Sequence, residues 1–349
     1  MRLDPIAWLL SVFLTALPGY HYQFPADHFN HPAFQTEWWY YTGNLHDSSG
    51  HRYGFELTFF RQALQLPQSA AESTGLVWRP DQIYLAHLAL TDIDAHTFYH
   101  TERLNRAGPG IAGVDIGSRK YWNGNWQVYW KNPATSEQQL QATCDRFTLT
   151  IDLAPLKPAV VHGKDGVSQK GPALGEASHY ISFTRLNAKG QLSGVSVSGV
   201  AWMDHEFFTQ QPNPTLAGWD WFAIQLDNNE ELMLYRLRNK SGEISSYSSG
   251  TYIDAKGEAH HLAAEDINFT PGRLWHKYPV DWQITVPKLG LQLTEQTALD
   301  AQELSTSNSP SPPYWEGAVT YTGSIHQQPT KGVGYLEMTG YGHPIRLGH

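Results

Sequence analysis

The chain has 349 residues, a formal net charge of −9 and only 16% charged residues. Because no run of basic residues stands out, a nucleic-acid partner and an anionic membrane surface are both disfavoured. The single cysteine, Cys144, excludes a disulfide within the chain and a thiolate metal cluster. Hydrophobic residues make up 41% of the sequence, which is typical of a globular chain long enough for two domains.

The first 19 residues are predicted to form a signal-peptide-like segment. Residues 6–17 are apolar and uncharged, and Arg2 precedes them. About twelve such residues are too few to span a bilayer but fit the apolar core of a signal peptide. The sequence therefore predicts an exported protein, periplasmic or secreted, without stable membrane insertion. A buried helix or a misplaced start codon is the alternative.

Short strand-like runs separated by Gly, Pro, Asn and Asp dominate the rest of the chain. The predicted strands are 38–45, 53–60, 83–90, 147–153, 180–186, 195–203, 219–226, 231–237, 282–286, 318–321 and 334–339. Many short strands with turn residues between them predict an all-β sandwich or barrel. Segments 160–174 and 301–313 are predicted to be surface loops.

An internal repeat divides the chain. EWWYYTGNL at 37–45 parallels GWDWFAIQL at 218–226, and ELTFFR at 56–61 parallels ELMLYR at 231–236. This alignment matches Trp38 with Trp219 and Tyr40 with Trp221. Since the matches keep the same order, they predict a duplication. The predicted domains are residues 20–206 and 218–349, joined by a linker at 207–217, and each is expected to close into a barrel.

The most concentrated ionisable cluster ends a predicted strand at Trp202, Asp204, His205 and Glu206. Strand alternation places Trp202, Asp204 and Glu206 on one face and His205 on the other. Two neighbouring carboxyl groups beside an indole favour a raised pKa, and a protonated carboxylic acid can deliver a proton to an apolar substrate. The alternative is a polar domain junction held by salt bridges.

Aromatic segments that open the two domains supply the other candidates. Glu37, Trp39 and Tyr41 share one strand face, while Trp38 lies on the opposite face. Glu37 is either a catalytic acid or the buried partner of an arginine. In the second domain, Asp220 shares an apolar face with Phe222, which is costly without a partner. The predicted ligand-binding residues are Trp38, Trp39, Tyr41, Trp202, Trp219, Asp220 and Trp221.

A metal site is not predicted. His28 and His31 could ligate a metal together with Asp27 or Glu37, but two histidines in a Pro-flanked loop are more often solvated or hydrogen-bonded. The sequence contains neither an HExxH run nor a G-x-S-x-G elbow, and no cofactor is expected.

Three segments carry a family resemblance: FPADHFNHPAFQTEWWYYTGNL, YGFELTFFRQ and GVAWMDHEF. They resemble the AttH/carotenoid 1,2-hydratase (CrtC-like) family, some of whose members carry the label "predicted secreted hydrolase". The resemblance extends over nearly the whole chain from Tyr22. It implies two tandem lipocalin-like (calycin) antiparallel β-barrel domains packed together, with a ligand site near the barrel mouths or the domain interface.

Two classes of function follow, with an apolar lipid or isoprenoid-like molecule as the expected partner in both. In the first, the protein is an enzyme, a hydratase or hydrolase, in which Asp204 or Glu206 acts as general acid towards an alkene or an ester leaving group. His205 would orient water, and Trp39 and Trp202 would stabilise positive charge. In the second, the protein is a non-catalytic carrier whose Asp204–Glu206 cluster holds the domain interface. An envelope accessory protein without a small ligand is a third possibility.

Overall fold

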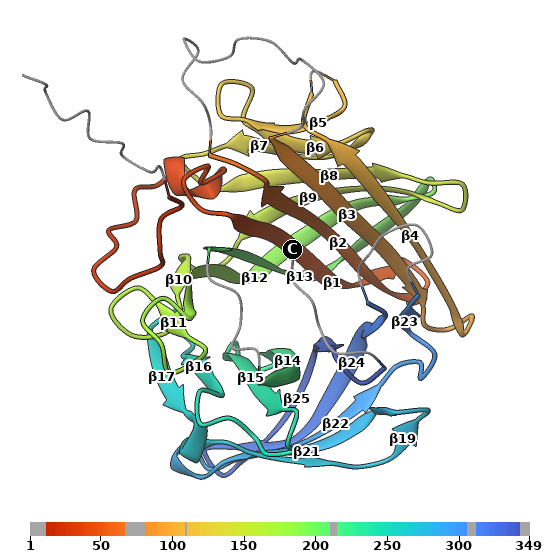
Figure 1. Ribbon diagram of the computed structural model, residues 1–349. Coiled ribbons are helices and arrows are strands. Elements are labelled where there is room, and N and C mark those ends of the chain that lie inside the picture. Colours follow the sequence, from red (N-terminus) through yellow and green to blue (C-terminus); the bar gives the residue numbers. More distant parts are fainter. Residues whose placement is uncertain (1–11, 67–80, 109, 210–214, 306–311, 343–349) are drawn as a thin grey trace, which may run out of the picture.

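The computed structural model describes residues 12–66, 81–108, 110–209, 215–305 and 312–342. Nearly all of its regular structure is β, arranged in two large sheets (Figure 1). Within the described residues, no helix is long and apolar enough to cross a membrane. Most of the predicted signal segment, residues 1–11, lies outside the described residues, as does much of the predicted linker.

The first sheet contains 13 strands. They are β1 (Thr36–Asp47), β2 (Arg52–Ala63), β3 (Gln82–Asp92), β4 (Thr97–Arg106), β5 (Ala112–Asp115), β6 (Lys120–Asn123), β7 (Trp126–Asn132), β8 (Glu137–Thr143), β9 (Thr148–Pro155), β10 (Val160–Val161), β11 (Ser168–Gln169), β12 (Ala177–Leu192) and β13 (Val195–Phe208). A short helix, η1 (Ala26–His28), precedes them. Strands β1 and β13, far apart in the sequence, pair along their whole length.

The two ends of the first sheet meet through side chains. Asn123 on β6 donates hydrogen bonds to the carbonyls of Tyr84 on β3 and Arg103 on β4, and accepts one from Asn105. These bonds replace the missing strand ladder, so the sheet forms a nearly closed barrel. Its interior holds an apolar core that includes Trp39, Tyr41, Leu57, Phe59, Leu88, Val128, Trp130, Leu149 and Met203.

The second sheet contains 10 strands and curves into a half-barrel. They are β14 (Leu216–Leu226), β15 (Glu231–Asn239), β16 (Ser249–Ile253), β17 (Ala259–Ala263), β18 (Asn268–Pro271), β21 (Asp281–Val286), β22 (Leu291–Thr297), β23 (Glu303–Leu304), β24 (Tyr314–Ile325) and β25 (Gln328–Met338). A small hairpin, β19 (Leu274–Trp275) with β20 (Tyr278–Pro279), and the short helices η2 (Ala264–Asp266) and η3 (Pro287–Leu289) complete it. The all-β fold class predicted from the sequence is confirmed. The expectation that each domain closes into a barrel is not: the first sheet nearly closes, whereas the second remains a half-barrel.

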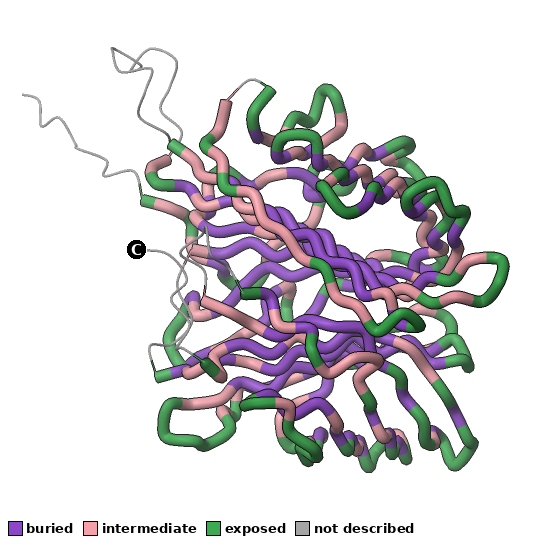
Figure 2. Tube along the Cα trace, turned by 90° about the vertical axis from the view of Figure 1, so that its right-hand side faces the viewer, coloured by how far each residue is buried: buried purple, intermediate pink, exposed green. Residues whose placement is uncertain are grey.

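The central strands of both sheets are buried on both faces (Figure 2). One face of β1 and β13 packs into the first barrel, and the other packs against the second sheet. One face of β14 and β25 packs into the core of the second sheet, and the other packs against the first sheet. The interface cluster includes Tyr40, Tyr180, Trp202, Trp221, Met233, Tyr235 and Tyr335. The two sheets therefore share one buried layer in addition to their own cores.

Segment 160–174, predicted as a surface loop, instead lies partly buried between the sheets. Its short strands β10 and β11 pair with β12. His162 and Ser168 are buried and contact Thr251 and Tyr235 of the second sheet. The segment is rich in Gly, Lys and Asp, a composition typical of surface loops. Composition alone therefore predicts a surface loop, because it does not show which few residues face inward.

Strand register corrects the alignment of the repeat. Glu37 lies opposite Arg61, and Asp220 lies opposite Arg236. Because the two arginines end the matching segments ELTFFR and ELMLYR, Glu37 corresponds to Asp220, and Trp38 corresponds to Trp221 rather than to Trp219. The sequence alignment is two residues out of register. A shift of two keeps every side chain on its predicted face, since side chains alternate along a strand.

The close pairing of β1 with β13 requires a glycine at position 199. A Cβ atom there would lie 2.0 Å from the carbonyl oxygen of Asn44, a backbone atom that no rotamer change can move. We expect Gly199→Ala to lower the free energy of unfolding by about 1–3 kcal/mol in urea titrations. Ser196→Ala, an exposed change on the same strand, should stay within about 0.5 kcal/mol of the wild type. Equal stability of the two variants would contradict this account.

Candidate functional site

A cavity of about 700 Å³ lies between the outer faces of the two sheets. Its wall is largely aromatic, with Trp38, Tyr40, Phe60, Tyr180, Phe208, Trp219, Trp221, Tyr235 and Tyr314 among the lining residues. Carboxyl groups also line it: Glu176, Asp204, Glu206, Glu316 and Glu337. An apolar chamber with a few polar groups is typical of a small-molecule site. The presence of several acids within it is the feature that needs a chemical explanation.

Asp204, on β13, is the best-connected acid of the cavity. Its Oδ2 accepts a hydrogen bond from Tyr180 (2.5 Å), and its Oδ1 accepts from Ser182 and from the indole N–H of Trp202 (2.6 Å). Burial raises the pKa of Asp204 to about 7, although the three donors act in the opposite direction. Near neutral pH this carboxyl group can therefore hold a proton and release it.

The second sheet reaches Asp204 through two hydrogen-bonded chains. The indole N–H of Trp221 donates to the Tyr180 hydroxyl (3.0 Å). On the other side, His162 Nε2 bonds Ser182 Oγ (2.7 Å), and its Nδ1 bonds Thr251 Oγ1 (2.8 Å). Both chains end on residues of the second sheet. The environment of the first domain's acid is therefore set partly by the second domain.

Glu206 lies two residues further along β13 but has a different role. Its Oε1 is contacted by the ammonium group of Lys170 and by the hydroxyl of Ser178. The same ammonium lies 5.5 Å from the ring centre of Tyr180 and 5.8 Å from that of Tyr235. Through these contacts Glu206 anchors Lys170 at the cavity wall.

Two further acids come from the second sheet. Tyr40 donates to Glu316 Oε1 (2.5 Å), and burial raises the pKa of Glu316 well above its usual range. Burial also raises the pKa of Glu337 to about 7, against a hydrogen bond from Trp219. Both residues line the cavity, and neither was identified from the sequence. The only signal was their alternation with aromatic residues in YWEGAVTY and GYLEMT, which does not reveal that the second face of each strand is covered.

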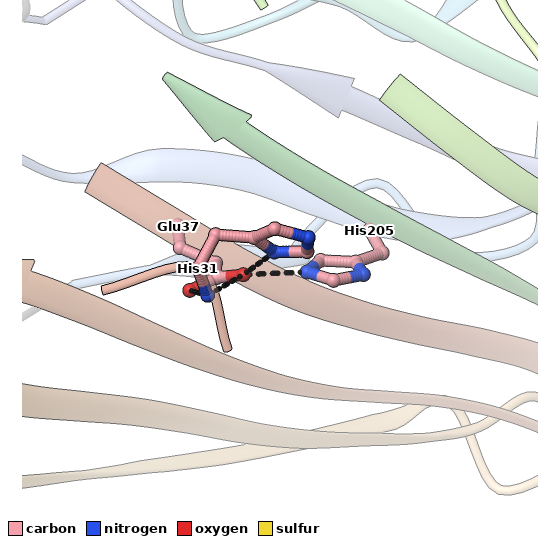
Figure 3. Close-up of side chains that lie close together, drawn as sticks. All are labelled: His31, Glu37 and His205. Atoms are coloured by element: carbon pink, nitrogen blue, oxygen red, sulfur yellow. Dashed lines mark hydrogen bonds and ion pairs between the residues drawn. The ribbon is translucent and has the colours of Figure 1, made fainter. Parts of the chain in front are cut away.

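A separate ionic cluster occupies the interior of the first barrel (Figure 3). Glu37 Oε2 accepts from Arg61 Nε (2.9 Å), and Oε1 contacts His31 Nδ1 (2.7 Å) and His205 Nε2 (2.8 Å). Burial alone would raise the pKa of Glu37, but Arg61 and His31 outweigh it and hold the pKa far below its usual range. Glu37 is therefore an ionised partner of an arginine, the second of the two roles considered for it.

This cluster attaches the N-terminal segment to the barrel. Arg61 also donates to the carbonyls of His31 (2.9 Å) and Phe34 (2.8 Å). The ligating atoms of His31, Glu37 and His205 lie within 4.8 Å of one another, which is close enough for a metal ion. However, Glu37 Oε1 already links the two imidazoles and Oε2 binds Arg61, so hydrogen bonding accounts for the arrangement.

Asp220 has the corresponding position in the second sheet. Its Oδ2 pairs with Arg236 (2.8 Å) and Arg238 (3.2 Å), and its Oδ1 accepts from the hydroxyl of Tyr341 (2.8 Å). Arg236 in turn lies 4.6 Å from the ring centre of Trp282. The cost of burying this carboxylate is thus offset by two guanidinium groups, and Asp220 does not line the cavity.

The candidate residues therefore separate into two locations. Asp204, Glu206, Trp38, Trp219 and Trp221 line the cavity between the sheets. The indole N–H of Trp202 donates a hydrogen bond to Asp204.

Glu37, Trp39, Tyr41 and His205 lie inside the first barrel, where Trp39 stacks on His205 with ring centres 5.0 Å apart. Trp39 and His205 do not line the cavity, so they cannot take the roles first considered for them beside Asp204.

The paired sheets and the cavity between them define a lipocalin-like protein of two β domains. Residues 15–341 match the AttH-like family, and the chain belongs to that family. The crystal structure of a protein from Nitrosomonas europaea described as AttH is 30% identical, covers 94% of this chain and 100% of its own, and has a TM-score of 0.81.

Kievitone hydratases are also similar. The enzyme of Fusarium solani subsp. phaseoli is 20% identical over 221 residues, which are 58% of this chain and 60% of that protein. This chain thus matches about three fifths of the length of that curated relative. The crystal structure of kievitone hydratase from Nectria haematococca is 15% identical, covers 95% of this chain and 98% of its own, and has a TM-score of 0.71, which shows a common fold.

Removing the charge of Glu37 should destabilise the ionic cluster that attaches the N-terminal segment to the first barrel. We expect Glu37→Gln to lower the free energy of unfolding by about 3–5 kcal/mol at pH 7, because Arg61 would be left buried without its carboxylate. The pKa of Glu37 is depressed in the folded state, so this stabilisation is full above the unfolded pKa and is lost as the pH falls towards the folded one.

Urea titrations at several pH values measure this effect. Asp152→Asn, which breaks a half-exposed pair with Lys131, is the control and should cost less than about 1 kcal/mol. If the two variants lost similar stability, the buried ion pair would not have the role assigned to it.

Proposed function

We propose that this protein is a hydratase-type enzyme that adds water to a double bond of an apolar, isoprenoid-like molecule held in the cavity between its sheets. The observation that carries the proposal is Asp204, a fully buried carboxyl group whose pKa is raised by burial to about 7 at the wall of an aromatic chamber. A general acid is most effective when its pKa lies near the working pH.

The cavity supports the remaining steps of such a reaction. Protonation of an alkene leaves positive charge on a neighbouring carbon, and aromatic faces stabilise cations in a water-poor site. Trp38, Trp219 and Trp221 line the chamber and are placed for this purpose. They replace Trp39 and Trp202, the rings considered from the sequence. The similarity to kievitone hydratases supports hydration over ester hydrolysis, for which the chain offers no nucleophile elbow.

Replacing the acid tests this proposal. Asp204→Asn should reduce turnover by about 10²–10⁴-fold, because the amide cannot deliver a proton. Wild-type turnover should fall as the pH rises through about 7, where Asp204 loses its proton. The substrates are kievitone and farnesol, which both carry a trisubstituted alkene, and the readout is the mass gain of one water by liquid chromatography and mass spectrometry.

Asp145→Asn, an exposed change outside the cavity, is the control and should keep full turnover. A carrier protein would behave differently: it would bind these molecules, quenching tryptophan fluorescence, without converting them. Binding without turnover in the wild type, or full turnover in Asp204→Asn, would contradict the enzyme proposal.

We also propose that the protein is exported, on the strength of the apolar run at residues 6–17. The end of this run contacts the first domain: the Leu14 N–H donates to the Ala33 carbonyl (2.8 Å), and Ala16 is buried beside Phe34 and Phe207. N-terminal sequencing of protein recovered from the periplasm or medium tests export and locates the cleavage site. Cytoplasmic protein that keeps Met1 would contradict it.

A further inference from the structure

The two sheets present matching positions to the cavity. In the first sheet Glu206 on β13 lies opposite Trp38 on β1, and in the second Glu337 on β25 lies opposite Trp221 on β14. Because Trp38 corresponds to Trp221 in the corrected repeat, Glu206 and Glu337 are equivalent positions of the two domains. Each domain thus contributes a glutamate and a tryptophan to the same chamber.

The carboxyl groups that line the cavity differ in their hydrogen-bond and ion-pair partners. Glu206 is held by Lys170 and Ser178. Glu176 accepts the backbone N–H of Ala173 (3.1 Å). Glu316 is 1% exposed; its Oε1 accepts from Tyr40, and its Oε2 is buried without a hydrogen-bond partner.

Glu337 differs from Glu206 and Glu316, and unlike Glu176, which is also partly buried, it lies on a strand of the second sheet. It is only partly buried although it lies on a central strand, and it lines the cavity, so its open side faces the chamber. Among the described residues no lysine or arginine forms an ion pair with it, and its side-chain partner is the Trp219 indole. A bound molecule or a water in the cavity can therefore reach the carboxyl group of Glu337.

Glu337 and Asp204 line the same cavity from different sheets. Trp221, the cross-strand neighbour of Glu337, donates to Tyr180, which donates to Asp204. Two carboxyl groups on opposite walls of one chamber are the arrangement that acid–base addition of water requires: one group gives a proton on one side and the other accepts a proton from water.

We propose that Glu337 is a second catalytic residue, the base that takes a proton from the attacking water while Asp204 gives a proton to the alkene. This inference rests on the proposed function. The O–H bond of Asp204 breaks as a C–H bond forms, which leaves a cation on the neighbouring alkene carbon. Water forms the C–O bond to that carbon and loses a proton to Glu337. The net change is the addition of one water, and the proton returns from Glu337 to Asp204 through solvent between turnovers.

The charges around Glu337 determine its pH response. The titratable groups around Glu337 that interact with it electrostatically are Asp204, Glu206, Lys170, Glu316, Glu56, Tyr40 and Tyr314. Because the base must be ionised and the acid protonated, the wild-type rate should form a bell near neutral pH. In Glu337→Gln the acidic side of the bell should disappear, and the alkaline side, which belongs to Asp204, should remain.

The decisive experiment measures protonation of the alkene and addition of water to the cation separately. Kievitone and farnesol are incubated in D₂O, and both hydrated product and deuterium in recovered alkene are measured. We expect Glu337→Gln to reduce hydration about 100-fold or more while deuterium exchange into the alkene continues, because Asp204 still forms the cation and can take the proton back. Asp204→Asn should lose both signals.

The matched control is Glu295→Gln. Glu295 on β22 is a buried acid whose pKa is raised by burial, as that of Glu337 is, but it lies outside the cavity. This variant should keep both signals, which shows that loss of a buried carboxyl group is not itself the cause.

Unchanged hydration in Glu337→Gln would overturn the inference, as would loss of deuterium exchange together with hydration, since a base is needed only after the cation forms. A wild type that hydrates neither probe would instead overturn the proposed function.

Discussion

The structure depends on one constraint: β1 and β14, and the second halves of β13 and β25, are largely buried on both faces. A strand sends alternate side chains to opposite sides, so each of these strands must satisfy two different environments at once. One set of side chains fills its own barrel, and the other meets the neighbouring domain. The cavity lies where these second faces do not fill the space between the sheets.

The buried carboxyl groups on the two faces of these strands have different partners. In the first barrel Glu37 pairs with Arg61, and in the second sheet Asp220 pairs with Arg236. Between the sheets the acids outnumber the cations, and burial raises the pKa values of Asp204, Glu316 and Glu337. The first arrangement stabilises the fold. The second brings the pKa values of Asp204 and Glu337 to about 7 beside an apolar cavity, where such groups can give up or accept a proton.

Much of this could be predicted from local pattern. Alternation within 37–41 and 202–206 gave the correct faces, because period-two burial is a property of the strand itself. What could not be predicted was which strands pair across long separations. Only the pairing of β1 with β13 brings His205 beside Trp39, inside the barrel and away from Asp204. Glu316 and Glu337 were missed for the same reason, since nothing in their own strands reveals the opposite sheet.

The equivalence of Glu206 and Glu337 has a consequence for how such a site can arise. A homodimer of one domain would present the same glutamate twice across its symmetry axis, and both copies would have identical surroundings. Fusion of the two copies in one chain removes that restriction. Here Lys170, from the segment before β12, reaches Glu206, while Glu337 has Trp219 as its partner. Tandem duplication thus allows two positions that began alike to acquire different charges while facing one ligand.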